Sequence, residues 1–221
     1  MRIAVLTSGG KDSILALHRI AEMGEIILVT AVSENADSYM FHTVNIHMID
    51  AVAECLDLPL QKIRVSGIEE REVEELRDGL SKLEIDAICS GVIASNYQLR
   101  RLKKICDHLG LKLLTPLWGE DQEKILREVA RNFEAIIVSV SAMGLDESFL
   151  GMKIDERGIE RLKMVSKRTK INLAGEGGEY ETLVLDAPLY KKKIIIKKIE
   201  KIWRGFSGFG VVTDFEFFEK F

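Results

Sequence analysis

The sequence predicts an α/β fold: a Rossmann-like parallel sheet with helices on both faces, followed by a smaller α+β C-terminal domain. In the first half, short apolar runs rich in β-branched residues alternate with segments whose apolar residues have helical spacing. From Thr182 onward, apolar runs dominate and indicate strands. Strands that alternate with helices of this length require right-handed crossovers, which make the first sheet parallel. Such sheets bind ligands at the carboxyl ends of their strands.

The elements of the first half follow from hydrophobic periodicity. The apolar runs at residues 2–6, 26–32, 61–66 and 85–92 are expected to be strands. Apolar residues recur three and four positions apart in residues 14–21, 49–56, 73–83 and 102–109, which predicts four helices. The loops that follow Leu6, Val32 and Gly91 should therefore converge on one crevice at the edge of the sheet.

The alternation is interrupted at Thr115-Pro116-Leu117-Trp118-Gly119. We place a domain boundary here, between residues 1–118 and residues 119–221. Beyond it, the spacing predicts helices near residues 125–133 and 159–165. Strands are expected at residues 135–140, 183–185, 193–199 and 211–218, with a glycine-rich turn before the last of them.

Composition excludes several classes of protein. The 221 residues are 47% hydrophobic and 30% charged, and no apolar run approaches the ~20 residues needed to span a membrane. The apolar start is too short for a signal peptide, so a cytoplasmic location is expected. Three widely spaced cysteines argue against disulfides and structural zinc. A net charge of −4 does not indicate a surface that binds nucleic acid. The lysines at 191–193 and 197–198 are interpreted as the exposed edge of a strand, with a local basic patch as the alternative.

The segment Ser8-Gly9-Gly10-Lys11-Asp12-Ser13 lies between the first expected strand and the first expected helix. Two glycines let the backbone approach a ligand and point successive amides at it, and the helix start adds partial positive charge. The serine hydroxyls and a mobile Lys11 cation would add donors. This is the composition of a phosphate-binding loop. It is not a Walker A loop, because Val5 and Asp12 stand where that motif needs glycine and serine or threonine.

Three further clusters are unusual. Residues 37–44 (D-S-Y-M-F-H-T-V) follow the second expected strand, and residues 91–98 (G-V-I-A-S-N-Y-Q) follow the fourth. Either is also compatible with an ordinary loop. Residues 175–182 read G-E-G-G-E-Y-E-T and place three carboxylates on a glycine-rich turn, where they repel one another unless a cation or hydrogen-bond donors are present. A solvated acidic turn is the alternative interpretation.

The loop at residues 8–13 resembles the S-G-G-x-D-S motif of the PP-loop ATP pyrophosphatases, which have the HUP (adenine nucleotide alpha-hydrolase-like) fold. All four clusters together resemble the diphthine–ammonia ligase family from Met1 to about Tyr190. The most specific element is the G-E-G-G-E-Y-E-T string followed by Leu185-Asp186-Ala187-Pro188, which generic PP-loop enzymes lack. The resemblance makes residues 1–118 a PP-loop ATP-binding domain and residues 119–221 a substrate-binding domain.

The resemblance implies the last step of diphthamide synthesis. ATP, ammonium and the diphthine side chain of elongation factor 2 give the amide, AMP and pyrophosphate through adenylation of the carboxylate, with Mg²⁺ assisting. The expected ATP-binding residues are Ser8, Gly9, Gly10, Lys11, Asp12, Ser13, Ala31, Val32 and Gly91. The expected catalytic residues are Lys11, Asp12, Glu176, Glu179 and Glu181, with Asp12 as a metal ligand. The expected substrate-binding residues are Tyr39, His42, Thr43, Ser95, Tyr97, Gly177, Gly178, Tyr180 and Thr182.

Specific roles follow for the acidic turn. Its glutamates would hold the trimethylammonium of diphthine or the ammonium, Tyr39 or Tyr180 would add a cation–π contact, and a glutamate would take the proton that ammonium must lose. One departure is Asn96, where the family pattern leads us to expect an acid. If an acid at this position serves a metal ion or ammonia in the family, that role is in doubt in this chain.

Two other functions remain open. A PP-loop tRNA-modifying enzyme would share the adenylation step but would need a basic cleft beside residues 8–13 or a Cys89 thiol pointing into it. A non-catalytic ATP-binding module would have little use for the acidic turn. The sequence sets no oligomeric state and leaves a homodimer open.

Overall fold

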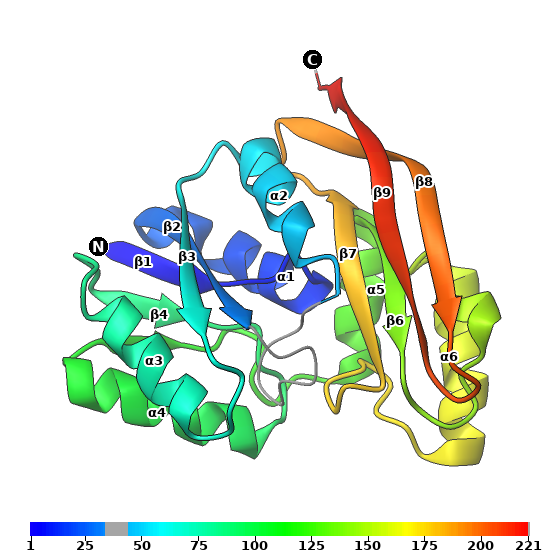
Figure 1. Ribbon diagram of the computed structural model, residues 1–221, viewed down its shortest axis with the longest axis horizontal. Helices are drawn as coiled ribbons and strands as arrows, with labels where there is room; N and C mark the ends of the chain where they lie inside the picture. Colours follow the sequence, from blue (N-terminus) through cyan, green and yellow to red (C-terminus); the bar gives the residue numbers. More distant parts are fainter. Residues whose placement is uncertain (34–43, 221) are drawn as a thin grey trace.

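The computed structural model describes residues 1–33 and 44–220, and its first half contains a five-stranded parallel sheet (Figure 1). The strand order is β3-β2-β1-β4-β5. Because the chain moves outward from β1 through β2 and β3 and then returns to β4, the order reverses between β1 and β4, the place where such sheets bind ligands. The strands are β1 (Arg2–Leu6), β2 (Glu25–Ser33), β3 (Leu60–Val65), β4 (Ala87–Cys89) and β5 (Lys112–Leu114).

Helices cover both faces of this sheet, as the sequence predicts. The helices α1 (Lys11–Ile20) and α2 (Ile49–Leu56) share one hydrophobic core with the sheet. The helices α3 (Arg71–Leu80) and α4 (Asn96–Leu109) share the core on the opposite face. The Rossmann-like class is therefore confirmed.

The second half forms a four-stranded antiparallel sheet with the order β7-β6-β9-β8. Its helices, α5 and α6, pack against each other. Three single-turn 3-10 helices complete the described chain: η1 (Ala21–Met23), η2 (Ile46–Met48) and η3 (Glu147–Phe149). The larger elements are α5 (Gln122–Asn132), β6 (Glu134–Val140), α6 (Glu156–Thr169), β7 (Tyr180–Asp186), β8 (Lys192–Trp203) and β9 (Gly208–Glu219).

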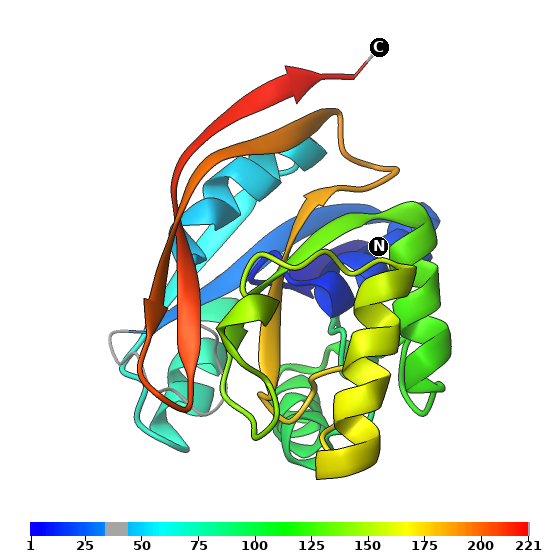
Figure 2. The same cartoon turned by 90° about the vertical axis from the view of Figure 1, so that its right-hand side faces the viewer.

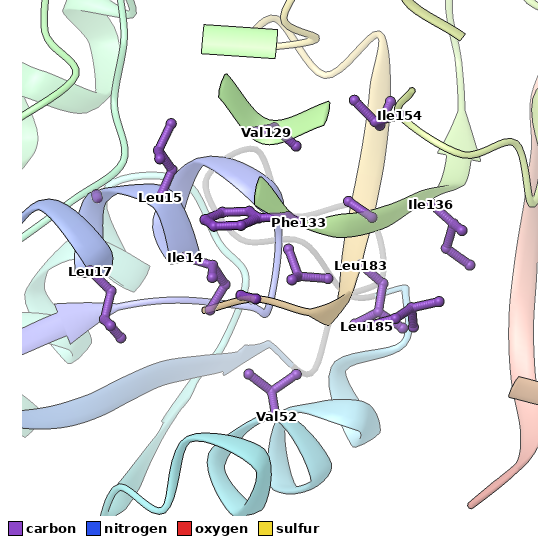
Figure 3. Packing of buried hydrophobic residues seen from close by; sticks show 14 of the residues in the cluster. Ile14, Leu15, Leu17, Val52, Val129, Phe133, Ile136, Ile154, Leu183 and Leu185 are labelled. Carbon is purple, nitrogen blue, oxygen red and sulfur yellow. The ribbon is translucent and has the colours of Figure 1, made fainter. Parts of the chain in front are cut away.

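A single core joins the two halves, and α1 lies inside it (Figure 3). Ile14 and Leu17 of α1, Val52 of α2 and Leu183 of β7 are all less than 2% exposed. Because α1 has the parallel sheet on one side and β7 on the other, the loop at its start is held between both halves. The boundary at residue 118 stays a prediction.

The structure differs from the expected elements in the fourth strand region. The expected strand 85–92 is confined to β4 (Ala87–Cys89), and Ser90 and Gly91, which follow it, line the cavity. β5 (Lys112–Leu114) has only three residues, and a run this short carries no periodicity by which to predict it. The expected helix 73–83 ends at Leu80.

The lysine-rich strand β8 lies at the edge of its sheet, as expected. Lys192 contacts Glu54, Lys193 contacts Glu134, and Lys197 contacts Glu216. Charged side chains on an edge strand discourage pairing with a second sheet. Within the described residues, every helix is too short or too polar to cross a lipid bilayer.

Candidate functional site

A cavity of about 170 Å³ lies at the carboxyl ends of β1 and β4, where the strand order reverses. Both halves of the chain line it, which places the phosphate-binding loop and the acidic turn around one space. The lining residues that the sequence analysis named are Ser8, Gly10, Lys11, Asp12, Ser13, Ala31, Gly91, Glu176, Tyr180, Glu181 and Thr182.

Hydroxyl groups fix the shape of the loop at residues 8–13. The Gly9 amide donates to Thr7 Oγ1 at 2.9 Å, and Thr7 Oγ1 shares a hydrogen bond of 2.7 Å with Ser13 Oγ. Ser13 Oγ also bonds the Gly10 carbonyl at 3.0 Å. Gly9 has φ +85°, a conformation that favours glycine. The Ser13 hydroxyl therefore holds the loop rather than pointing freely at a ligand.

The loop presents backbone amides at the start of α1. Gly10 is the N-cap, and its lack of a side chain leaves the first turn without a side-chain cap. Within the described residues, the amides of Ser8 and Gly10 donate to no protein acceptor. Free amides together with the helix dipole favour an anion.

Strand β7 holds the loop from its other side. The Lys11 amide donates to Thr182 Oγ1 at 3.1 Å, and the Val184 amide donates to the Gly9 carbonyl at 2.9 Å. Thr182, named in the sequence analysis for substrate binding, is therefore in contact with the phosphate-binding loop itself. These two bonds connect residues more than 170 positions apart.

The expectation that Lys11 is a mobile cation is wrong. Its side chain is 3% exposed, and Nζ donates to Asp12 Oδ2 at 2.8 Å and to the Ala174 carbonyl at 2.5 Å. The ammonium also lies 5.2 Å from the centroid of the Tyr180 ring, within cation–π range. Lys11 thus connects the phosphate-binding loop to the acidic turn.

Gly91 packs against the backbone of the loop. A Cβ atom at this position would lie 2.5 Å from the Asp12 carbonyl carbon and 2.6 Å from the Ser13 nitrogen. Gly91 was expected to bind ATP. The structure gives a packing reason for glycine at this position, since only a residue without a side chain lets β4 end directly beside the start of α1.

Glu176 contacts the chain just after β4. Its carboxylate accepts hydrogen bonds from the Ile93 amide at 2.5 Å and from the Ala94 amide at 2.6 and 2.8 Å. Bonds from two amides to one carboxylate are charge-assisted and strong. Glu176 therefore connects the acidic turn to the loop that follows β4.

Glu179 also bonds backbone amides, and it does not line the cavity. It accepts from Asn172 and from Gly177, both at 2.8 Å, and so closes the turn on itself. Only Glu176 and Glu181 of the three glutamates line the cavity. Within the described residues, no three acidic, histidine or cysteine side chains are close enough to hold a metal ion. Binding of an organic cation or of ammonium by the turn stays a prediction.

Tyr180 is buried beneath the cavity. Its hydroxyl donates to the Leu173 carbonyl at 2.8 Å, and burial, with smaller contributions from Asp12 and Glu179, raises the pKa of the phenol well above its usual value. Its ring lies against Gly175, where a Cβ would be 2.8 Å away. Because Lys11 already lies over this ring, the expected cation–π contact with a substrate is occupied by the protein's own cation.

Ser95 and Tyr97 lie at the start of α4, outside the cavity lining. Ser95 is the N-cap, and its hydroxyl accepts from the Gln98 amide at 3.3 Å. The Tyr97 hydroxyl donates to Glu69 at 3.0 Å, and the Arg101 guanidinium lies 3.3 Å from the ring centroid. Burial and the bond to Glu69 raise the pKa of Tyr97. Both residues organise this helix end.

The remaining named residues fall outside the lining or outside the described chain. Val32, Gly9, Gly177 and Gly178 do not line the cavity. In β2 the lining residues are Val29, Thr30 and Ala31, so the strand itself forms the wall. Tyr39, His42 and Thr43 lie outside the described residues.

Several lining residues lie outside the motifs recognised in the sequence, among them Thr7, Thr30, Asn45 and Ser90. Thr7 and Ser90 directly border the motifs already recognised, so their positions at strand ends could have identified them. Thr30 lies within an apolar run, and nothing in its local pattern indicates a site. Asn45 directly follows the cluster at residues 37–44, so its position could also have identified it.

Fold and site together define an α/β protein with Rossmann-like strand order and a glycine-rich anion-binding loop at the point where that order reverses. Residues 1–113 match the family model of the diphthamide synthase N-terminal domain, and residues 121–215 match that of the C-terminal domain. The chain belongs to the diphthamide synthase family.

Curated relatives of this chain extend over nearly its whole length. The diphthine–ammonia ligase of Rattus norvegicus is 39% identical, over 96% of this chain and 89% of that protein. The ligases of Bos taurus and Homo sapiens are each 37% identical, over 99% of this chain and 91% of theirs.

In the part of the chain that the structure describes, the features that a tRNA-modifying enzyme would need are not found. Cys89 is fully buried, and burial raises the pKa of its thiol to about 12, which keeps it protonated and unreactive. The charged residues that line the cavity are Lys11 together with Asp12, Glu176 and Glu181, so this space is not a basic cleft. That alternative is not favoured.

Proposed function

We propose that this chain is a diphthine–ammonia ligase, which uses ATP to convert the diphthine carboxylate of elongation factor 2 into the diphthamide amide in the cytoplasm. The observation that carries the proposal is the cavity shared by the phosphate-binding loop and the acidic turn, in a chain that aligns with the ligases over nearly its whole length. A non-catalytic ATP-binding module would not need Glu176 and Glu181 in that cavity.

The chemistry requires activation of a poor electrophile. A carboxylate oxygen attacks the α-phosphorus of ATP, the bond to the bridging oxygen breaks, and pyrophosphate leaves with the electron pair. Ammonia then attacks the acyl carbon, and AMP leaves with the electrons of the acyl–oxygen bond. Ammonium must lose one proton before this attack, and the resulting amine loses a second one.

The phosphate-binding loop is suited to the first step. The amides of Ser8 and Gly10 and the start of α1 provide hydrogen-bond donors and partial positive charge where the pyrophosphate acquires charge. These amides need not reorient during the reaction, because hydrogen bonds to Thr7, Ser13 and Thr182 already hold the loop in shape. The apolar part of the cavity wall, including Val29 and Leu102, would accept the adenine ring.

The donor set fits Mg²⁺, which usually binds one or two carboxylates together with substrate phosphates and water. Asp12 lines the cavity beside the loop amides and would supply a carboxylate oxygen. Bound there, the metal would neutralise charge on the phosphates. Lys11, at 2.8 Å from Asp12 Oδ2, would hold this carboxylate in place.

Glu181 is our candidate for the group that accepts a proton from ammonium. It lines the cavity, and Glu179 does not. Glu176 would shape the site through the loop after β4 and contribute negative charge facing the cationic substrates. The proton-acceptor role expected of the turn is thereby assigned to one glutamate.

The test is a matched pair of variants, Glu181→Gln and Glu179→Gln, assayed with ATP, ammonium and diphthine-bearing elongation factor 2. Mass spectrometry follows the modified histidine. The wild type should form the amide, and Glu181→Gln should lower turnover by ~10²-fold or more, the usual contribution of a general base. Glu179→Gln should mainly lower stability. Full amidation by Glu181→Gln would refute its role, and no amidation by the wild type would refute the function.

A further inference from the structure

Asn45 lies in the cavity wall, and none of the sequence motifs includes it. It is 5% exposed and adopts the left-handed conformation, with φ +58°. It immediately precedes η2 (Ile46–Met48), which leads directly into α2. A buried asparagine amide needs hydrogen-bond partners, and its partners here identify what it does.

Both ends of the Asn45 amide bond the backbone of β9. Nδ2 donates to the Gly210 carbonyl at 2.7 Å, and Oδ1 accepts from the Val212 amide at 2.8 Å. His47 adds a contact of 2.9 Å between Nε2 and the Val212 carbonyl. The segment before α2 is therefore attached to a strand 165 residues away in the chain, and Figure 2 shows α2 beneath β8 and β9.

These bonds fill a gap in the antiparallel sheet. β6 pairs with β9 only through Ser139↔Phe209 and Val140↔Gly208. Alternate residues of a strand point their backbone groups toward opposite neighbours, so Gly210 and Val212 face the same side as Gly208, away from β8. Asn45 takes the place of a neighbouring strand there, and Val138 of β6 lines the cavity beside it.

We propose that Asn45 is a positioning residue that attaches β9 of the C-terminal half, which we expect to bind the protein substrate, to the cavity wall. This inference rests on the proposed function, from which the identity of the protein substrate is taken. Asn45 makes no bond to the phosphate-binding loop, so its loss should spare the groups that hold the ATP phosphates. It should instead loosen the wall formed by Val44, Asn45 and Val138.

The test replaces Asn45 with glycine, because glycine tolerates φ +58° and so removes the amide without adding backbone strain. Asp57→Gly is the matched control, since Asp57 has φ +54° at the end of α2 and does not line the cavity. Hydrogen exchange of the Val212 amide gives a readout that does not depend on activity.

We expect Asn45→Gly to speed exchange at Val212 and to lower kcat/KM for diphthine-bearing elongation factor 2 on the order of 10-fold, the effect of leaving two buried backbone groups unpaired. The KM for ATP should stay within about twofold, and Asp57→Gly should match the wild type on each measure. Unchanged exchange at Val212, or an equal loss in ATP and acceptor kinetics, would overturn the proposal. If the wild type does not amidate diphthine-bearing elongation factor 2, the proposed function is refuted. Hydrogen exchange of the Val212 amide then still decides whether Asn45 holds β9.

Discussion

The contact between Gly91 and the start of α1 gives a sharp prediction. The three atoms nearest to a Cβ at position 91 would be backbone atoms of Asp12 and Ser13, at 2.5 to 2.6 Å. Backbone atoms cannot rotate away, so Gly91→Ala must displace the phosphate-binding loop or the end of β4 by roughly 1 Å. A displacement of that size at a reacting centre costs ~10²-fold in rate. Overpacking of this kind also costs ~1–3 kcal/mol of stability.

The assay compares Gly91→Ala with Gly110→Ala for AMP release and for urea unfolding. Gly110 ends α4 with φ +69° and has no atom within 4 Å of the position of a Cβ. Alanine there should cost ~1 kcal/mol through backbone strain and leave turnover within about twofold of the wild type. Gly91→Ala should lower turnover by ~10²-fold although its free energy of unfolding is similar to that of Gly110→Ala. Turnover within a few-fold of the wild type would refute the inferred packing.

Three further predictions concern single side chains. Thr182→Val should lower the free energy of unfolding by ~1 kcal/mol and weaken ATP binding, because the Lys11 amide loses its acceptor. An unchanged free energy in urea unfolding and an unchanged affinity in ATP titration would contradict this prediction. Burial lowers the pKa of His18 below 6.5, so below that pH the unfolded chain binds a proton that the folded one does not. The free energy of unfolding should therefore fall as the pH drops through 6.5. His18→Gln keeps an acceptor for the Leu189 amide and should remove this part of the pH dependence, which urea unfolding at several pH values would measure. Cys89 should resist a thiol reagent at pH 8 until the chain unfolds, because burial raises its pKa to about 12; rapid labelling of the folded protein would show an exposed thiol.

The parallel half of the fold could be predicted because its signal is local. Ile14 and Leu17 show helical spacing, and the strands that become β1 and β2 are continuous apolar runs. The glycines at positions 9 and 10 indicated a phosphate-binding loop because amide presentation and helix initiation are both properties of adjacent residues. The three residues of β5 were missed because so short a strand depends on pairing with β4.

The roles of site residues could be predicted less well, because tertiary contacts decide them. Lys11 was expected to be mobile, yet the carbonyl of Ala174, 163 residues away, holds its ammonium. Glu179 had the chemistry of a cation ligand, but the amides of its own turn occupy its carboxylate. Asn45 directly follows the cluster at residues 37–44, but its role could not be predicted, because its partners lie on a strand at the far end of the chain.

We propose that the amides at the start of α1 hold the pyrophosphate that leaves when the carboxylate attacks ATP. The most direct measurement uses ATP radiolabelled in its α-phosphate, with ammonium and diphthine-bearing elongation factor 2, and separates the labelled nucleotides formed. We predict labelled AMP in a one-to-one ratio with the amide, and none when the acceptor is omitted. Labelled ADP as the product would rule out this mechanism.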